Sequence, residues 1–255
     1  MNLSGHTILI TGGSAGIGLA FAKKFVELDN VVIVTGRRQS KLDEVKAANP
    51  KIHCIQSDVA KSADIKALAV KVAAEFPKLD FLMNNAGVFV NRNLSRPAKD
   101  LDSLMEEMDI NVGGTIRTTS AFVDLITANK GTILNVSSGL AYVPLPSSPI
   151  YCATKAAVHS YTISLRFQLE AAGVRVIELL PPAVKTELTA DIPEGGDFTV
   201  ITTDVLVDAT IKGLKADKTE IRVGQSGQLY WMQAIAPGFI NAQLWKGSKS
   251  LVPPA

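Results

Sequence analysis

Short apolar runs alternate along the chain with longer stretches that are apolar on one side of a helix and polar on the other. The short runs are rich in β-branched residues and predict strands, and the longer stretches have the spacing of amphipathic helices. The strands predicted in this way are residues 7–10, 31–34, 52–56, 79–83, 132–136, 174–179 and 220–223. The predicted helices are residues 17–28, 40–48, 62–76, 101–128, 149–172 and 204–216.

This alternation predicts an α/β fold whose sheet is parallel and doubly wound, with helices on both faces. The strands are apolar throughout rather than at every second position, as expected of a sheet that is covered on both sides. No linker, repeat or low-complexity segment divides the sequence, so residues 1–255 are predicted to form a single domain. Ser148 followed by Pro149 is expected to begin the helix over 149–172, and Gly173 to end it.

The segment 225–255 departs from this pattern because aromatic side chains gather in it. These residues are Tyr230, Trp231, Phe239 and Trp245, on either side of a Pro-Gly pair. The favoured interpretation is that the segment packs against its own domain or against a partner subunit. Contact with a membrane surface and a position over the substrate pocket are the alternatives.

Composition and charge narrow the possible function classes. Hydrophobic residues make up 47% of the chain and charged residues 20%, which is typical of a folded globular protein and excludes extensive disorder. The net charge of +2 gives no reason to expect a nucleic-acid partner or an anionic membrane. No apolar run approaches the roughly 20 residues that a transmembrane helix needs. The first residues lack the pattern of a signal peptide, so a cytoplasmic protein is expected.

Cysteine and histidine suggest neither a disulfide framework nor a metal site. The two cysteines stand alone in the sequence and are expected to be reduced thiols. The three histidines lack the spacing of metal ligands, so no metal cofactor is predicted. His159 follows Lys155 by one helical turn, but a histidine at a helix interface is the favoured interpretation over a catalytic one.

The clearest motif is a glycine-rich loop, TGGSAGIG, at residues 11–18. It follows the first predicted strand and opens the first helix, which is the context in which such a loop binds a dinucleotide. Gly12, Gly16 and Gly18 allow a tight turn and a close approach of the backbone to a ligand. The helix start then offers free N–H groups and a positive dipole end to a pyrophosphate.

The end of the second predicted strand indicates which dinucleotide is bound. An NAD-binding enzyme has an acidic residue there for the ribose 2′-hydroxyl, whereas this chain has Arg37 and Arg38 and no acid. Guanidinium groups pair with a 2′-phosphate, which a carboxylate would repel. The sequence therefore predicts NADP(H), with the Ser14 hydroxyl as a further contact to the same phosphate. Two solvated surface arginines are the alternative interpretation.

Tyr151 and Lys155 are one turn apart in a predicted helix and share one of its faces. A free phenol has a pKa near 10, and a neighbouring ammonium favours the phenolate, so Tyr151 is predicted to act as a general acid/base. Ser138 follows the fifth strand, where α/β sheets place ligands, and its hydroxyl is suited to bind a substrate oxygen. A helix-surface pair and a serine that caps a turn are the alternatives for these residues.

Together these motifs resemble the short-chain dehydrogenase/reductase family. Residues 4–225 contain, in the family's order and approximate spacing, the glycine-rich loop, the sequence NNAG, Asn111, Ser138, Tyr151 and Lys155. The resemblance implies a Rossmann-type sheet of seven strands.

The resemblance also implies roles for individual residues. It implies a catalytic tetrad of Asn111, Ser138, Tyr151 and Lys155. In such a tetrad the lysine also binds the nicotinamide ribose, and the asparagine holds a water molecule that continues the proton relay. The residues expected to bind the cofactor are Gly12, Ser14, Gly16, Ile17, Gly18, Arg37, Arg38, Asp58, Val59, Asn85, Ala86, Gly87, Tyr151, Lys155, Pro181, Val184 and Thr186. A helix cap is the alternative for Asp58, and a turn residue for Asn85.

One position departs from the family pattern. After the sixth strand the family has Pro-Gly, whereas this chain has Pro181 followed by Pro182, which stiffens the backbone. Val184 and Thr186 are still expected to meet the nicotinamide carboxamide. The Pro-Pro form resembles a bacterial branch labelled DltE-like.

The function predicted from these features is that of an NADP(H)-dependent carbonyl reductase or alcohol dehydrogenase. A non-catalytic NADP(H)-binding sensor or scaffold is the alternative, and the short chain disfavours a nucleotide-sugar epimerase or dehydratase. The expected substrate is a small, neutral, apolar carbonyl compound or secondary alcohol. The residues expected to line its pocket are Phe89, Val90, Tyr142, Val143, Leu145 and Leu188. The resemblance implies a homodimer or homotetramer built from the helices 101–128 and 149–172.

Overall fold

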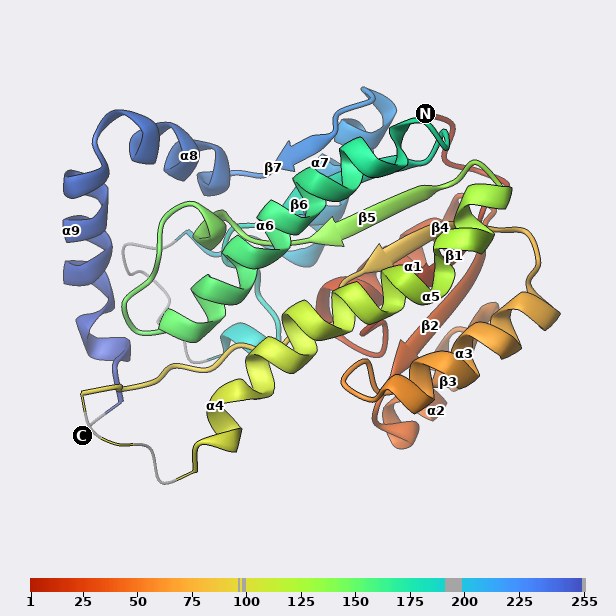
Figure 1. The fold of residues 1–255 in the computed structure, drawn as a ribbon, viewed down its shortest axis with the longest axis horizontal. Coiled ribbons are helices and arrows are strands. Elements are labelled where there is room, and N and C mark those ends of the chain that lie inside the picture. The colour runs from red at the N-terminus through yellow and green to blue at the C-terminus, as the bar shows by residue number, and fades with distance from the viewer. Residues whose placement is uncertain (96, 98–99, 191–198, 254–255) are drawn as a thin grey trace.

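A parallel sheet of seven strands runs through the protein (Figure 1). The computed structural model describes residues 1–95, 97, 100–190 and 199–253. The strands are β1 (Thr7–Ile10), β2 (Val31–Gly36), β3 (Ile52–Gln56), β4 (Leu79–Asn84), β5 (Thr132–Val136), β6 (Arg175–Leu180) and β7 (Glu220–Arg222). Their order in the sheet is β3-β2-β1-β4-β5-β6-β7. The order reverses between β1 and β4, and sheets of this kind bind ligands outside the carboxyl ends of the strands at such a point.

The central strands are apolar because both faces of the sheet are buried. Every residue of β1 and of β5 is buried. All seven predicted strands are present, and their ends differ from the prediction by at most two residues. The predicted α/β class and the parallel, doubly wound sheet are confirmed.

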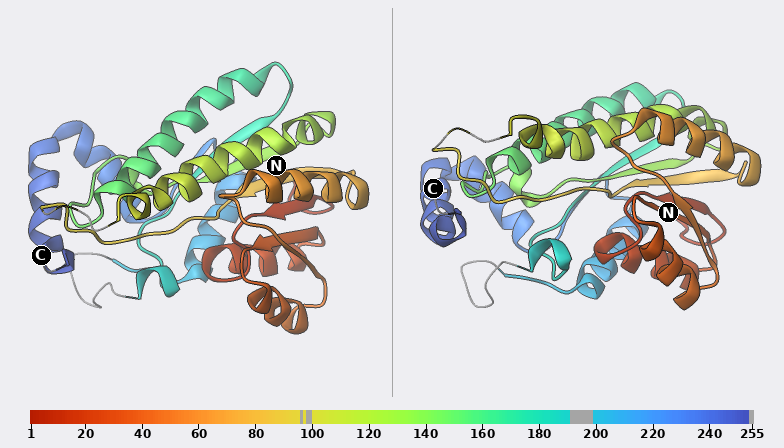
Figure 2. Two further views of the ribbon diagram at one scale, coloured as in Figure 1. Left: turned by 60° about the horizontal axis from the view of Figure 1, so that its bottom comes forward. Right: turned by 90° about the horizontal axis from the view of Figure 1, so that it is seen from below.

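Helices cover both faces of the sheet, as Figure 2 shows. The helices before the C-terminal segment are α1 (Gly16–Glu27), α2 (Gln39–Ala48), α3 (Ser62–Glu75), α4 (Asp102–Glu107), α5 (Gly114–Ala128), α6 (Pro149–Glu170) and α7 (Thr203–Lys215). Phe21 of α1 and Leu206 of α7 belong to the hydrophobic core on one face of the sheet. Leu68 of α3, Phe122 of α5 and Leu165 of α6 belong to the core on the other face. The sheet is therefore the middle one of three layers.

The long helix predicted over 101–128 is interrupted. Residues Met108–Gly113 form a π-helix between α4 and α5. Gly113 ends this turn and Gly114 begins α5, and because glycine is a poor helix former, this stretch of chain is easily distorted. Local π-helices are frequent at functional sites. This one contains Asn111, the first residue of the expected tetrad.

The sequence predicted where α6 begins and where it ends, but not all of the contacts at its start. Gly173 has a φ of +70°, and its backbone N–H bonds to Glu170 O, so it ends the helix as predicted. α6 begins at Pro149 with Ser148 at its N-cap position, as predicted, but the Ser148 side chain makes no cap hydrogen bond with the helix. Its hydroxyl instead donates to Asn91 Oδ1 at 2.6 Å and ties α6 to the chain that follows β4.

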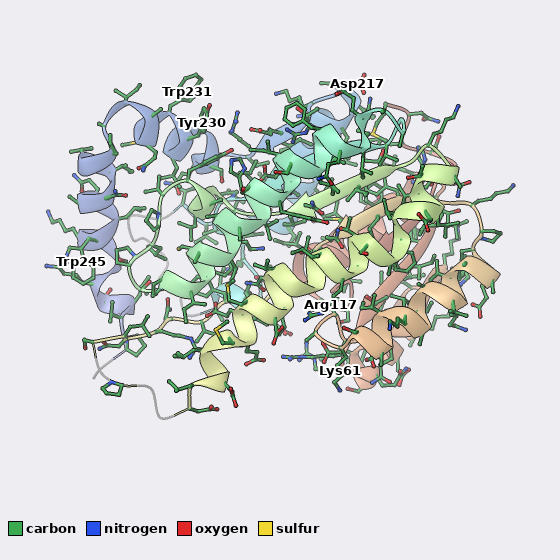
Figure 3. The ribbon with its side chains drawn as sticks, viewed as in Figure 1. Lys61, Arg117, Asp217, Tyr230, Trp231 and Trp245 are labelled. Carbon is green, nitrogen blue, oxygen red and sulfur yellow. The ribbon has the colours of Figure 1, made fainter. Side chains whose placement is uncertain are left out.

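The C-terminal segment forms two helices, α8 (Gln225–Ile235) and α9 (Pro237–Ser248), at the end of the molecule toward which β5 points (Figure 1). Its aliphatic side chains pack inward, where Ile240 and Leu244 join Val143 in a small core. Its tryptophans lie on the outside of the two helices (Figure 3), with Trp231 63% and Trp245 45% exposed. Among the helices that the structure describes, none combines the length and the hydropathy that crossing a bilayer would demand.

Candidate active site

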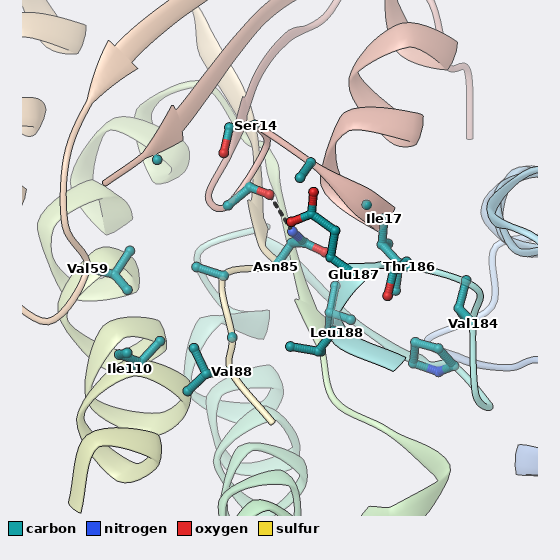
Figure 4. A pocket seen from close by; sticks show the side chains of 18 of the residues that line it. Ser14, Ile17, Val59, Asn85, Val88, Ile110, Val184, Thr186, Glu187 and Leu188 are labelled. Atoms are coloured by element: carbon teal, nitrogen blue, oxygen red, sulfur yellow. Dashed lines mark hydrogen bonds between the residues drawn. The ribbon is translucent and has the colours of Figure 1, made fainter. Parts of the chain in front are cut away.

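A cavity of about 390 Å³ opens at the carboxyl edge of the sheet (Figure 4). The segments that follow β1, β2, β3, β4 and β6 line it, together with the end of β5. In Figure 4, Ser14 lies toward the top of this cavity and Val88 and Leu188 toward the bottom. We call this cavity the cofactor groove.

The glycine-rich loop forms one wall of the cofactor groove. Gly12 and Gly16 have φ values of +65° and +52°, in the left-handed region that favours glycine. The residue before α1, Ala15, has no side chain able to cap the helix, so the first N–H groups of α1 have no side-chain partner. Since this helix start faces the groove, it fits the diphosphate of a dinucleotide.

Four hydrogen bonds hold the loop against the segment after β4. The Thr11 hydroxyl accepts hydrogen bonds from the backbone N–H groups of Asn85 (3.0 Å) and Ala86 (3.1 Å). The Asn85 side chain donates to the carbonyls of Thr11 (3.0 Å) and Gly12 (3.2 Å). Asn85 thus holds the loop in place and lines the groove at once.

Gly18 is the one expected cofactor residue that does not line the groove. It lies behind the loop, where a Cβ would be 2.5 Å from Gly12 O and 2.6 Å from Asn85 Nδ2. Gly18→Ala is therefore expected to lower the free energy of unfolding by about 2 kcal/mol, because neither neighbour can move away without breaking the loop's hydrogen bonds. Urea denaturation measures this change. Gly227→Ala is the matched control, since a Cβ there meets nothing closer than 3.9 Å, and equal stabilities of the two variants would contradict the expectation.

Arg37 and Arg38 lie at the rim of the cofactor groove, where the sequence predicted them. Each guanidinium faces a carboxylate, Arg37 with Glu106 at 3.6 Å and Arg38 with Glu187 at 3.7 Å. All four side chains are more than half exposed, so these ion pairs contribute little to stability and are easily exchanged for another anion.

The other expected cofactor residues also reach the groove. They are Ser14, Ile17, Asp58, Val59, Ala86, Gly87, Pro181, Val184 and Thr186. The Asp58 carboxylate accepts from the backbone N–H of Ala60 at 3.0 Å, so it caps a turn as well as lining the groove. Pro182 lines the groove in place of the family's glycine, and the next residues continue into a parallel bridge between Val184 and Ile201.

Ser138, Tyr151 and Lys155 meet at the inner end of the groove. The Lys155 ammonium lies 5.5 Å from the centre of the Tyr151 ring and donates to Val136 O at 2.9 Å. Burial lowers the pKa of Lys155 to about 8. Burial raises the pKa of Tyr151, while a hydrogen bond between the Ser138 and Tyr151 side chains lowers it. Burial therefore favours the neutral phenol, because the cost of burying the phenolate exceeds the stabilisation that the Ser138 hydrogen bond provides.

Ser138 also fulfils the alternative interpretation of its sequence position. Its Oγ accepts a hydrogen bond from Leu140 N at 3.1 Å and caps the short 3₁₀-helix Gly139–Ala141. Because the cap uses the oxygen as an acceptor, the hydroxyl proton remains directed to another partner. Capping and substrate binding are therefore compatible in this residue.

Asn111 does not line the groove but lies close behind its wall, where a Cβ on Gly87 would be 3.2 Å from Asn111 Oδ1 and 3.7 Å from Lys155 Nζ. Its Oδ1 accepts from Val88 N (2.8 Å), and its Nδ2 donates to Val88 O and to Thr154 Oγ1 (both 3.0 Å). Both amide protons are thus used, and the side chain is buried. Asn111 fastens the segment after β4 to α6, and these contacts hold the wall of the groove beside Gly87.

A second cavity, of about 300 Å³, adjoins the first, and we call it the distal cavity. Of the six residues expected to line a substrate pocket, Phe89, Leu145 and Leu188 do so. Val143 is packed in the small core under α9, and Tyr142 stacks edge-on against His159, so neither reaches the cavity. Val90 is also outside the lining.

The outer wall of the distal cavity comes from the C-terminal segment, which the sequence analysis did not assign to it. Its members are Gln225, Gln228, Leu229, Met232, Ile240, Gln243, Leu244 and Leu251. The only available signal was the helical spacing of Leu229 with Met232 and of Ile240 with Leu244. The segment therefore packs against its own domain, as the favoured interpretation held, and also lies over this cavity, as one alternative did.

Comparisons with known proteins agree with this geometry. The family model for short chain dehydrogenases matches residues 6–196. The chain belongs to this family. "Uncharacterized oxidoreductase DltE" of Bacillus subtilis (strain 168) is 39% identical to it over 87% of this chain and 89% of the relative. The resemblance found in the sequence is therefore confirmed, and the chain is an oxidoreductase of the short-chain dehydrogenase family.

Solved structures of the family share the fold. A short chain dehydrogenase from Burkholderia cenocepacia J2315 in complex with NADP has a TM-score of 0.85 at 26% identity, covering 96% of this chain and 99% of that one. A 3-ketoacyl-(acyl-carrier-protein) reductase from Brucella melitensis complexed with NADH has a TM-score of 0.77 at 28% identity, covering 83% and 91%. Members of this fold thus bind both dinucleotides.

Proposed function

We propose that the protein is an NADP(H)-dependent carbonyl reductase or alcohol dehydrogenase in which Tyr151 is the general acid/base. The observation that carries this proposal is the position of two side chains. Tyr151 and Ser138 line the cofactor groove and the distal cavity at once. A substrate oxygen beside them is within reach of a hydroxyl proton, and its carbon faces the inner end of the groove.

A bound nicotinamide would supply a hydride to the carbonyl carbon, or accept one from the alcohol carbon in the reverse direction. Tyr151 Oη then donates its proton to the carbonyl oxygen, and in reverse it accepts the alcohol proton. Ser138 binds the same oxygen and stabilises the negative charge that develops on it. The Lys155 ammonium stabilises the phenolate that remains on Tyr151.

Arg37 and Arg38 support the choice of NADP(H) over NAD(H). They directly follow β2, where the ribose of the adenosine half lies in dinucleotide-binding folds. Their exposed partners, Glu106 and Glu187, are weakly held, so a 2′-phosphate can replace them with two charge-assisted hydrogen bonds.

The distal cavity supports a neutral substrate. Among the described residues that line it, none is charged, and its polar side chains are hydroxyls and carboxamides. A carboxylate in this cavity would lose its hydration without gaining a cation, which costs several kcal/mol. We therefore expect kcat/KM for a neutral ketone or aldehyde to exceed that for a keto acid of the same size by about tenfold or more. Steady-state assays on such matched pairs measure the ratio, and a preference for the keto acids would contradict it.

The test of the proposed function is the consumption of NADPH with a panel of aldehydes and ketones, repeated with NADH. Turnover with NADPH and a clear preference for it over NADH are expected. The second candidate, a dinucleotide-binding sensor, predicts binding of NADPH without oxidation across the whole panel. The meeting of Ser138, Tyr151 and Lys155 at the junction of the two cavities favours the enzyme, since a sensor needs no acid/base there.

A further inference from the structure

A glutamate is buried in the middle of the sheet, close to the proposed catalytic residues. Glu178 lies on β6 between Ile177 and Leu179, and its side chain is fully buried. A buried carboxylate is costly unless its oxygens are hydrogen-bonded or paired with a charge. Its partners therefore indicate what the residue is for.

Both carboxylate oxygens of Glu178 are engaged. Oε1 accepts a hydrogen bond from the Ser137 hydroxyl, at the end of β5. Oε2 accepts from His159 Nδ1 at 2.8 Å, and the His159 side chain is still 22% exposed. The carboxylate is thus fixed between the sheet and α6, while its histidine partner reaches the surface.

The strand register places Glu178 one residue from the backbone oxygen that binds Lys155. On β5, Asn135 pairs with Glu178 and Val136 pairs with Leu179. Val136 O is the acceptor that holds the Lys155 ammonium at 2.9 Å. His159 follows Lys155 by one turn of α6, on the same side of the helix. Glu178 therefore lies one residue along the sheet from the pair that includes Val136. Its two hydrogen-bond donors also neighbour proposed catalytic residues, since Ser137 precedes Ser138 and His159 follows Lys155 by one turn.

We propose that Glu178 is a positioning residue that acts through Lys155: its carboxylate keeps the buried ammonium charged, and His159 holds that carboxylate in place. This inference rests on the proposed function, in which a charged Lys155 stabilises the Tyr151 phenolate. It assigns His159 a role that the spacing alone did not favour.

The electrostatic environment agrees with this arrangement. Burial lowers the pKa of Lys155 to about 8, and Glu178 opposes this decrease. The hydrogen bond to Glu178 raises the pKa of His159. From β7, Glu220 and Arg222 also face His159, with opposite effects on its pKa.

One further ring, that of Tyr142, packs edge-on against His159 at 5.0 Å between centroids. Burial raises the pKa of Tyr142 to about 12, so this phenol is neutral near pH 8. The groups there whose pKa the surroundings shift into the range of the test are thus Lys155 and His159. Removing the negative charge of Glu178 must lower the pKa of Lys155, so the ammonium would be lost at a lower pH.

The direct test is the NMR titration of the Lys155 side chain in protein labelled with ¹³C at lysine Cε, with the resonance assigned by its loss in Lys155→Met. In Glu178→Gln, which keeps the size and an acceptor for Ser137, the midpoint is expected to move down by about one pH unit. In His159→Gln, which removes the donor that holds the carboxylate but keeps its negative charge, a downward shift smaller than that in Glu178→Gln is expected. Equal shifts in the two variants, or no shift in either, would overturn the proposal.

Two additions keep this test decisive. Glu178→Asp retains the negative charge on a shorter side chain, so the charge lies farther from Lys155. The midpoint of the Lys155 titration should then move down by less than in Glu178→Gln. This variant replaces Glu178→Gln if the latter does not fold. In the carbonyl reduction assay, Glu178→Gln should lose about tenfold in kcat at pH 9 relative to wild type and less than about twofold at pH 6.5. The titration needs no substrate, so a protein without reductase activity would refute the proposed function and leave the NMR result to decide the role of Glu178.

Discussion

Replacing Tyr151 by phenylalanine is expected to reduce kcat/KM for carbonyl reduction by about a thousandfold, because the substrate oxygen then loses its proton donor. The ring, its edge-on contact with Phe89 at 4.8 Å and the shape of both cavities are retained. Binding of NADPH should therefore change by less than about threefold. Steady-state kinetics and a fluorescence titration of NADPH measure the two quantities.

Tyr161→Phe is the matched control for this prediction. Tyr161 lies on the same helix, α6, and packs against the core on that face of the sheet, away from both cavities. The same loss of a hydroxyl there should leave kcat/KM within about twofold of the wild type. Equal activities of Tyr151→Phe and the wild type would remove the basis of the enzymatic proposal.

The double variant Arg37→Ala/Arg38→Ala is expected to raise the KM for NADPH about a hundredfold and to change that for NADH little. Hydrogen bonds to a charged group contribute about 1.5–3 kcal/mol each, and about 1.4 kcal/mol corresponds to a factor of ten. The loss of the ion pairs with Glu106 and Glu187 has almost no cost, since all four side chains are exposed. The cofactor preference of the variant is read from kcat/KM for the two dinucleotides.

Arg175→Ala controls for the general effect of removing a cation. Arg175 begins β6, at the opposite edge of the sheet from the cofactor groove, and pairs with Asp217 at 2.9 Å. Its replacement should leave the ratio of the two kcat/KM values unchanged. A similar decrease with NADPH and NADH in the double variant would show that the arginines do not recognise the 2′-phosphate.

The fold was predictable from the sequence because the strands are apolar at successive positions. In β1 and β5 this pattern corresponds to burial on both faces, which only a sheet between two helical layers provides. The cofactor groove was predictable for a related reason. Its residues directly follow strands, and parallel strands bring their carboxyl ends to one edge.

Several features depend on contacts between distant segments and could not be predicted from local patterns. The sequence around Asn111 is compatible with a regular helix, and the π-helix becomes visible only in three dimensions. Ser148 precedes a proline as a capping residue would, but its hydroxyl donates to Asn91, in a segment far away in the chain. The pairing of Glu178 with His159 likewise joins two positions whose patterns are those of a core strand and a helix surface.

The C-terminal segment was the least predictable part because its largest apolar side chains are exposed, while smaller apolar side chains pack inward. Trp231 and Trp245 face outward, whereas Leu229, Ile240 and Leu244 turn toward the distal cavity. Leu229 with Met232 and Ile240 with Leu244 are the apolar pairs at helical spacing, and two such pairs are too few to identify two short helices among so many aromatic residues.

The division of labour between the two cavities has a consequence for how the protein can diversify. The residues proposed to bind the dinucleotide and to transfer the proton come before residue 190, whereas α8 and α9 supply most of the outer wall of the distal cavity. We expect that chimeras carrying the C-terminal helices of a relative would take on that relative's substrate preference and keep the same hydride transfer. This end of the chain can therefore change during evolution without altering the reaction.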